Sequence, residues 1–314
     1  MKLVSKVALC AALSIGVQAQ AAEFVTVLTG GTSGAYFPIG TALSKFYGDA
    51  MPNTKVTVQS TKASAENLNL IQAGRGELGF ALGDAVSNAW QGNADAGFAK
   101  KLDKLRAIAG IYPNYIQIAA SEDSGIKTLA DLKGKRVAVG APKSGTELNA
   151  RALFKAAGMS YDDFSKVEYI SFGQSVELMK NRQIDATLVS AGLGVAAVKD
   201  LSTNIAIRLI PIGEDVIAKV GDAAYQPASI PANTYAGQTE AVPTAAIRNI
   251  LVTNSGVSDE DAYTMTKVLF DQLSALHAAH KATLAIDPKT AAVGVPVPLH
   301  PGAERYYREA GLLK

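Results

Sequence analysis

The pattern that most restricts the fold is a strand, a loop rich in glycine and small hydroxyl residues, and a helix, and it occurs twice. The first copy contains "TGGTSGAYFPIG" (29–40) and the second contains "VGAPKSGTELNAR" (139–151). The pairs Ser33–Gly34 and Ser144–Gly145 each open a helix, and they lie about 110 residues apart, within the usual size of one domain. The helix–strand segments 69–84 and 177–192 show the same offset. We therefore predict two similarly built α/β lobes.

The rest of the chain supports parallel-sheet units, because strands alternate with helices of about 10 to 15 residues. From about Ala224 the chain is rich in Pro, Thr and Ala, which suits a segment that crosses between lobes. A strand near 245–254 and one long amphipathic helix over 259–280 follow. We place lobe 1 in residues 22–117 together with 225–314, and lobe 2 in residues 118–224.

The N-terminus has the layout of a secretory signal peptide. Lys2 and Lys6 precede the apolar run "VALCAALSIGV", and Ala19-Gln20-Ala21 forms an A-x-A cleavage pattern. The run is shorter than the roughly 20 apolar residues that a membrane span needs. We predict cleavage after residues 1–21 and a periplasmic mature protein.

Composition excludes several classes of function. Cys10 is the only cysteine and lies inside the predicted signal, so the mature chain has no thiol for catalysis or metal binding. Without Lys2 and Lys6, the 30 basic residues fall to 28, which matches the 28 acidic residues. A mature net charge near zero gives no reason to expect a nucleic-acid partner.

The two glycine loops are the candidate binding elements. The N-terminus of a helix presents unpaired N–H groups and the positive end of its dipole, and glycine lets an anion approach them. We interpret residues 31–36, with Gly31 included, and residues 143–147 as two halves of one cleft for an acidic ligand. The alternative is an ordinary tight turn with an N-cap, since Ser144 to Glu147 reads as a capping box, S-x-x-E.

Three further segments contain candidate ligand-binding residues. Lys62, Ser64 and Asn67 lie between a predicted strand and helix, at the end of the strand where open α/β sheets bind ligands; Ser64 alternatively serves as an N-cap. Asp84 follows a buried strand and is either a ligand contact or a helix cap. Tyr112 is either a cleft or hinge residue or a packed core tyrosine.

Catalysis has little support. The segment 140–146 lacks the lysine that a P-loop requires after its second glycine, and no dinucleotide-binding fingerprint follows a strand. No histidine lies near either Ser–Gly loop, and His277 and His280 have no nearby acid to complete a metal site. We predict no enzyme activity, no metal site and no cofactor.

Over essentially the whole mature chain, the sequence resembles the TAXI-type solute-binding proteins of tripartite ATP-independent periplasmic (TRAP) transporters. The blocks that carry the resemblance are "TGGTSGAYFPIG", "TKASAENLNLIQAGRGELGFAL", "GIYPNYIQI", "LADLKGKRVAVGAPKSGTELNAR", "RQIDATLVSAG", "IPANTYAGQTEAVPT" and "PLHPGAERYYREAGL". The resemblance implies a two-lobed, type II-like periplasmic binding protein with a hinge and a ligand cleft between the lobes.

The same resemblance implies a function. It implies capture of a small carboxylate, such as glutamate, 2-oxoglutarate or a related dicarboxylate, and delivery to TRAP membrane subunits, whose small and large components are often fused. Carried over by position, the implied ligand shell comprises Ser33, Gly34, Tyr36, Ser64, Asn67, Ser144, Gly145 and Thr146. One departure is "LGD" (82–84), where relatives commonly have Gln-Ser-Asp, and it leaves the contribution of Asp84 open.

Three other classes stay open from the sequence. The first is a binding protein of an ATP-driven importer, with similar lobes and a different membrane partner. The second is a ligand sensor that presents its closed form to a receptor kinase. The third, a secreted α/β enzyme, needs a base near a nucleophile, and the sequence shows none.

Overall fold

A computed structural model describes residues 23–313, so the predicted signal peptide lies outside the described residues. The first parallel unit consists of β1 (Glu23–Leu28), α1 (Tyr36–Ala50), β2 (Thr54–Gln59), α2 (Ser64–Gln72), β3 (Leu78–Leu82) and α3 (Gly83–Gln91). The second consists of β5 (Arg136–Ala138), α4 (Gly145–Ala156), β6 (Lys166–Glu168), α5 (Phe172–Lys180), β7 (Ala186–Ala191) and α6 (Ala196–Asn204). The repeated sequence pattern thus becomes a repeated fold.

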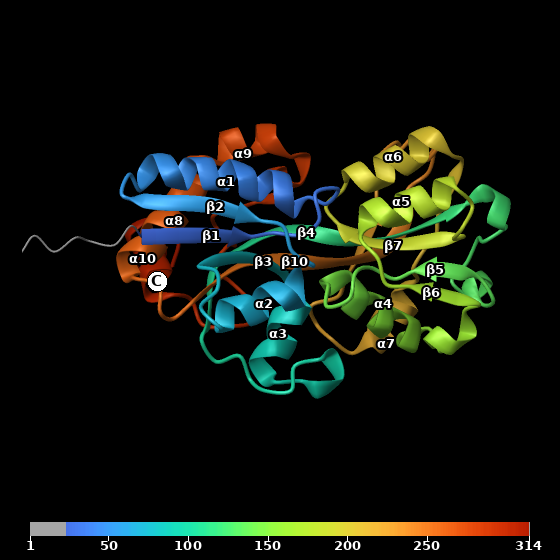
Figure 1. Ribbon diagram of the computed structural model, residues 1–314, viewed down its shortest axis with the longest axis horizontal. Coiled ribbons are helices and arrows are strands. Elements are labelled where there is room, and N and C mark those ends of the chain that lie inside the picture. The colour runs from blue at the N-terminus through green and yellow to red at the C-terminus, as the bar shows by residue number, and fades with distance from the viewer. Residues whose placement is uncertain (1–22, 314) are drawn as a thin grey trace, which may run out of the picture.

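The strand order makes the repetition explicit. It runs β2-β1-β3-β10-β4-β7-β5-β6, so each unit places its first strand between its other two. Within each unit the strands are parallel, while β10 (Val242–Asn254) and β4 (Leu105–Ser121) join the units through antiparallel pairs. The first unit and the C-terminal helices form lobe 1, and the second unit forms lobe 2; in Figure 1 these lie left and right.

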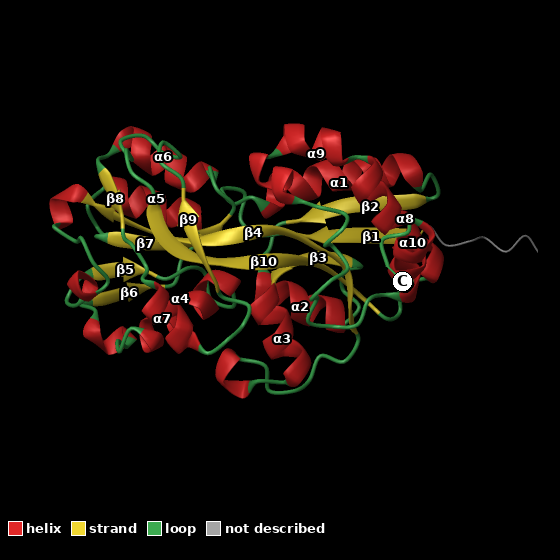
Figure 2. Ribbon diagram, turned by 180° about the vertical axis from the view of Figure 1, so that it is seen from behind, coloured by secondary structure: helices red, strands yellow, loops and turns green. Residues whose placement is uncertain are grey.

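The remaining elements complete the lobes. They are η1 (Ala94–Ala96), η2 (Glu122–Ser124), η3 (Ala130–Leu132), η4 (Tyr161–Asp163), β8 (Ile207–Leu209), α7 (Glu214–Val220), β9 (Gln226–Ile230), α8 (Asp259–Asp271), α9 (Leu273–Ala279), η5 (Lys281–Ala285) and α10 (Pro301–Glu309). Strands β8 and β9 pair with β4 and β10 respectively. Figure 2 shows the helices covering both faces of the continuous sheet.

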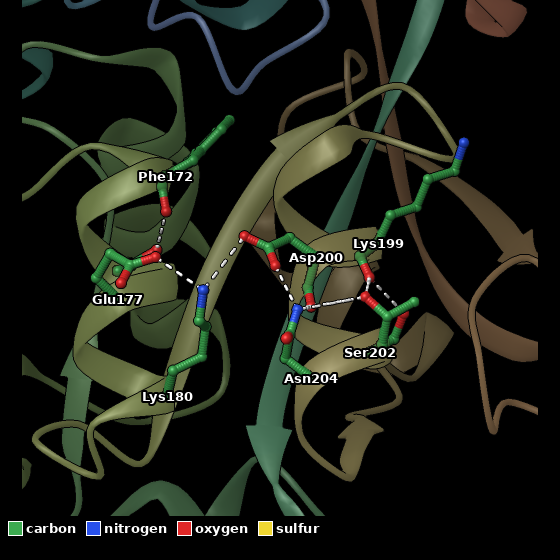
Figure 3. Close-up of polar contacts among 9 residues, drawn as sticks. Phe172, Glu177, Lys180, Lys199, Asp200, Ser202 and Asn204 are labelled. Atoms are coloured by element: carbon green, nitrogen blue, oxygen red, sulfur yellow. Dashed lines mark hydrogen bonds and ion pairs between the residues drawn. The ribbon is translucent and has the colours of Figure 1, made fainter.

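The cores follow this layout. One buried cluster packs α1, α8 and α10 against the sheet of lobe 1 and includes Tyr47, Met265 and Tyr307. A second surrounds α5 and α6 in lobe 2, and a third runs through both lobes. Helices α5 and α6 are also tied together at the surface, where Lys180 contacts Glu177 at 2.9 Å and Asp200 at 3.7 Å (Figure 3).

One element differs from the sequence expectations. The predicted helix over 259–280 is two helices, α8 and α9, which meet at Gln272. The segment around Pro113 is a single strand, β4, which pairs with β10 on both sides of that proline. A predicted domain boundary at 117/118 therefore falls inside a strand that both lobes share, and the proposed division into 22–117 with 225–314 and 118–224 stays a prediction.

Of the described helices, none has the length and apolar character to cross a membrane. Two of the histidines cap helices: the ring Nδ1 of His280 accepts from Ala282 N–H at 3.1 Å, and that of His300 accepts from Gly302 N–H at 3.2 Å. Among residues 23–313, no cluster of three acidic, histidine or cysteine side chains has the arrangement of a metal site.

Candidate functional site

Four helix N-termini meet at one cavity. Helices α1, α2, α4 and α5 follow β1, β2, β5 and β6, and the carboxyl ends of these parallel strands face the space between the lobes. The cavity has a volume of about 120 Å³, which is room for a small organic molecule rather than a single water. It is lined by Gly30, Gly31, Gly34, Ala35, Tyr36, Thr61, Lys62, Ala63, Ser64, Leu82, Asn114, Ala141, Ser144, Gly145, Thr146, Ser171, Phe172, Ser190 and Ala191.

Lobe 1 contributes two helix starts without side-chain caps. The residue before α1 is Ala35 and the residue before α2 is Ala63, and neither has a side-chain capping hydrogen bond. Ala63 has a φ of 71°, a conformation that is uncommon for a residue with a side chain, and its N–H donates to Thr61 Oγ1 at 2.9 Å. The first N–H groups of a helix have no partner within the helix, so both starts offer donors to a bound anion.

Lobe 2 contributes two helix starts with serine caps. Ser144 Oγ accepts from the N–H of Glu147 at 3.1 Å, and Ser171 Oγ accepts from the N–H of Gln174 at 3.4 Å. The predicted capping box at 144–147 is only half formed, because the carboxylate of Glu147 pairs with Arg151 at 2.6 Å. Each serine thus accepts a hydrogen bond from one backbone N–H of its helix. The N–H groups that precede it in the first turn of α4 and of α5 can donate to a ligand.

The lobes touch each other around the cavity. The N–H of Glu66 in α2 donates to the carbonyl of Lys143, just before α4, at 3.2 Å. A Cβ added to Gly145 would lie 2.5 Å from Ser64 Oγ, so only glycine fits at this approach of the two helix starts. A Cβ on Gly34 would lie 3.7 Å from the ring of Phe172. The structure therefore shows the lobes closed on each other.

A buried polar chain forms beneath the cavity. The hydroxyl of Tyr36 donates to Asn249 Oδ1 on β10, and Asn249 Nδ2 donates to Asn114 Oδ1 on β4 at 2.9 Å. Asn114 Nδ2 in turn donates to the carbonyl of Ser190 on β7 at 3.1 Å. Burial raises the pKa of Tyr36 well above its usual range, so this residue is a neutral phenol that stacks on Phe80. The chain fixes Tyr36 of α1 and Asn114 of the shared strand β4, which both line the cavity.

The charges of the lining favour an anion. Among the described residues that line the cavity, Lys62 alone carries a formal charge, and no carboxylate is present. Hydroxyl groups, helix N-termini and one lysine therefore face apolar groups such as Leu82 and Phe172. Such a site suits a small solute with at least one acidic group and is a poor site for a cation.

The structure brings most of the predicted site residues to this cavity. Those that line it are Gly31, Gly34, Tyr36, Lys62, Ser64, Ser144, Gly145 and Thr146. Ser64 is not an N-cap as the alternative held, because α2 begins at Ser64 itself and its Oγ accepts from Leu82 N–H at 3.1 Å. Whether each of these residues contacts a solute stays a prediction.

Four predicted residues lie outside the lining. Ser33 lies close to Gly173 of the other lobe, since a Cβ added to Gly173 would lie 3.0 Å from Ser33 Oγ. Asn67 is fully buried and ties the loops together, because its Nδ2 donates to the carbonyls of Thr29 and Phe80, at 2.7 and 2.9 Å, while its Oδ1 accepts from Thr61 at 2.6 Å. Asn67 therefore acts on the cavity indirectly, by orienting Thr61, which lines it. Tyr112 belongs to the core of lobe 1, as the alternative held.

Asp84 is the fourth residue outside the lining. It lies in the first turn of α3 and faces α4 instead of the cavity, with its Oδ2 accepting from Asn149 and Tyr225. Burial, the largest cause, raises its pKa to about 6. The charged and titratable groups near it are Tyr36 of α1, Asp95 of η1, Arg151 and Lys155 of α4, Lys219 of α7, and Asp222 and Tyr225 before β9.

We expect the ionisation of Asp84 to reduce stability as the pH rises. A folded pKa of about 6, above the ordinary 3.8, means that the folded protein binds the proton more tightly. The protonated carboxyl of Asp84 therefore contributes fully to the free energy of unfolding below about pH 4. This contribution, about 3 kcal/mol in total, is lost as the pH rises to about 6. The free energy of unfolding in urea, measured from pH 4 to pH 7, checks this. Asp84→Asn should remove the Asp84 contribution, so that the free energy of unfolding falls less from pH 4 to pH 7 in the variant than in wild type, and an equal pH dependence in both proteins would contradict the assignment.

Sequence reasoning missed several lining residues. Ser171 and Phe172 are not among the predicted site residues, although Ser171 to Gln174 forms a capping box that the sequence displays as S-x-x-Q. In the fold this segment is the counterpart of the Ser64 loop, since both follow the second strand of their unit. Asn114 and Ser190 lie within strands β4 and β7, and their place at the cavity depends on strand order alone.

Comparison with known proteins gives one family match. The model of the NMT1-like family matches residues 27–311, which is nearly all of the described chain. The finer TAXI assignment remains a prediction from the sequence blocks.

Solved structures show the same fold. A protein of Bordetella bronchiseptica RB50 has a TM-score of 0.57 at 15% identity, covering 92% of this chain and 98% of its own. The alkanesulfonate-binding protein SsuA of Xanthomonas axonopodis pv. citri, bound to MOPS, has a TM-score of 0.50 at 19% identity, covering 92% and 85%. An ancestral arginine-binding protein bound to arginine has a TM-score of 0.51 at 14% identity, covering 83% and 97%. The predicted two-lobed fold of periplasmic solute-binding proteins is thus confirmed.

Proposed function

This chain belongs to the NMT1-like family, and on that premise we propose that it is an extracytoplasmic solute-binding protein that closes its lobes on a small carboxylate. Glutamate, 2-oxoglutarate and related dicarboxylates are the proposed solutes. The single observation that carries the proposal is the meeting of four helix N-termini, two from each lobe, at a cavity with no carboxylate in its lining.

The strength of such a site is sufficient for capture. A hydrogen bond to a charged group contributes roughly 1.5 to 3 kcal/mol, and a micromolar dissociation constant corresponds to about −8 kcal/mol. Several donors from both lobes therefore account for micromolar binding without a buried salt bridge. Because donors come from both lobes, the solute makes its full set of contacts only in the closed arrangement, and binding stabilises that arrangement.

The residues that line the cavity also predict which solutes bind more tightly. An ammonium group would find carbonyl and hydroxyl oxygens there, but no carboxylate among the described lining residues. Burying an ammonium without an acidic partner is costly. We expect 2-oxoglutarate-type acids to bind more tightly than the matching amino acids.

The membrane partner is the less constrained part of the proposal. The sequence blocks favour TRAP subunits, which use an ion gradient. An importer driven by ATP is a second candidate, supported by the fold shared with the alkanesulfonate-binding protein. The three oxygens of a sulfonate group would suit the same converging N–H groups. In either case the protein is a carrier without enzyme activity, and the predicted signal peptide would export it.

A thermal-shift panel tests the proposed function. Purified mature protein is heated with C4 and C5 dicarboxylates, amino acids, alkanesulfonates, neutral sugars and simple cations, each at 1 mM or roughly a thousand times a micromolar dissociation constant. Such an excess stabilises the folded state by about 4 kcal/mol. The expected result is a rise in melting temperature with dicarboxylates. Stabilisation by sulfonates alone would favour the second candidate, and stabilisation by sugars or cations alone would contradict the anion site.

A further inference from the structure

A second polar cluster joins the two lobes away from the cavity. It consists of Asp84 in α3, Asn149 in α4 and Tyr225, which lies between α7 and β9. Asn149 Nδ2 donates to Asp84 Oδ2 at 2.7 Å and to the oxygen of Tyr225 at 2.8 Å, while the Tyr225 hydroxyl donates to Asp84 Oδ2 at 2.9 Å. The three side chains thus form a closed triangle across the boundary between the lobes.

The cluster is buried and separate from the proposed solute site. The exposed fractions of Asp84, Asn149 and Tyr225 are 2%, 0% and 5%. None of the three lines the cavity; Asp84 and Tyr225 instead border a surface cleft formed by α3, α4 and α7. A solute in the cavity would therefore not touch these side chains.

Two atoms of the cluster oppose closure. Asp84 Oδ1 and Asn149 Oδ1 are buried acceptors that have no hydrogen-bond partner among residues 23–313. Each would regain water if the lobes separated, so their burial costs free energy, whereas the hydrogen bonds to Asp84 Oδ2 favour closure. Because the two effects have opposite signs, the cluster favours closure by less than its hydrogen bonds alone would give, and each of its side chains can shift the equilibrium.

We propose that Asp84, Asn149 and Tyr225 form an interlobe latch that sets the open–closed equilibrium, and through it the affinity for the solute, without contacting the solute. The effect on affinity rests on the proposed function, whereas the effect on the open–closed equilibrium does not depend on which solute binds. When only a fraction of the molecules is competent to bind, the apparent dissociation constant rises in inverse proportion to that fraction. The three residues would therefore act on affinity by positioning the lobes and not by binding the solute.

The test measures closure directly, without a solute. Spin labels at Asn53→Cys in lobe 1 and Ser165→Cys in lobe 2 report the distance between lobes; both positions are exposed, and the mature chain has no other cysteine. Asn149→Ala removes a donor to Asp84 and suits a helix. It is expected to move the distance distribution of the solute-free protein toward longer distances. Tyr225→Phe, which removes the hydroxyl alone, should do the same to a smaller extent.

An exchange of the two residues separates a latch from a merely structural role. Asp84→Asn combined with Asn149→Asp restores a carboxylate–amide pair with the positions exchanged, so it is expected to return the distribution toward wild type. With 2-oxoglutarate as the probe, Asn149→Ala should weaken affinity about tenfold, and the double variant should recover it.

The outcomes are distinct. An unchanged distance distribution in both Asn149→Ala and Tyr225→Phe, or a double variant no better than Asn149→Ala, would overturn the latch. If wild type does not bind 2-oxoglutarate, the proposed carboxylate function loses support, but the distance measurements still decide whether the latch exists.

Discussion

Replacing Gly145 by valine is expected to abolish solute binding while leaving the folded protein intact. Even a Cβ at this position would lie 2.5 Å from Ser64 Oγ and 2.7 Å from a methyl group of Leu82, both in the opposite lobe. Separation of the lobes relieves this overlap, because each lobe has a buried cluster of its own. The variant should therefore remain folded and fail to close.

We expect the affinity for the best-stabilising dicarboxylate to fall at least about 100-fold, which corresponds to about 2.7 kcal/mol. Isothermal titration calorimetry measures the affinity, and circular dichroism with thermal melting checks the fold. Gly48→Val is the matched control, since a Cβ on Gly48 in α1 meets nothing within 4 Å. Wild-type affinity in Gly145→Val would show that α4 and α2 do not approach each other when solute is bound.

Asn249→Ala is expected to destabilise the protein by about 3 kcal/mol. Asn249 is fully buried, accepts from the Tyr36 hydroxyl, and donates to the Tyr112 carbonyl at 2.7 Å and to Asn114 Oδ1 at 2.9 Å. Alanine leaves these three groups without their partner, at a cost of about 1 kcal/mol each. For a protein of this size, the melting temperature should fall by roughly 5 to 10 °C.

The same change should weaken solute binding, because Tyr36 and Asn114 line the cavity and lose the group that orients them. Urea unfolding measures the stability, and calorimetry measures the binding. Asn69→Ala is the control, because Asn69 is exposed on α2 and its side-chain amide donates to the carbonyl of Ala65, one turn earlier in the same helix. A loss below 0.5 kcal/mol, the usual range for exposed sites, is expected for the control, and a loss of that size for Asn249→Ala would mean that water replaces the missing amide.

The candidate site was predictable where local chemistry marks it. The segments 29–40 and 139–151 carry glycine and serine at the start of a helix, and such a start has the same chemistry in any fold. Ser144, Gly145 and Tyr36 were therefore found from the sequence and lie at the cavity. Asn114 was not found, because one asparagine in a strand is unremarkable until its neighbours are known.

Asp84 shows what local chemistry leaves open. Its place after a buried strand matched the pattern of a ligand contact, but the orientation of α3 directs it to Asn149 in the other lobe. The direction in which a side chain leaves a helix start depends on how that helix packs against the sheet, and helix packing is a property of the whole fold.

The sequence by itself determined the local features of the protein's two halves. These are the alternation of strands and helices, the two glycine loops, and the lack of a thiol after residue 10. These features are local, since backbone conformation and helix capping depend on residues a few positions apart. Only the tertiary structure decided that β4 and β10 join the halves into one sheet and that Ser64 and Gly145 meet between them. Such contacts link residues far apart in the chain, and packing across the sheet selects them.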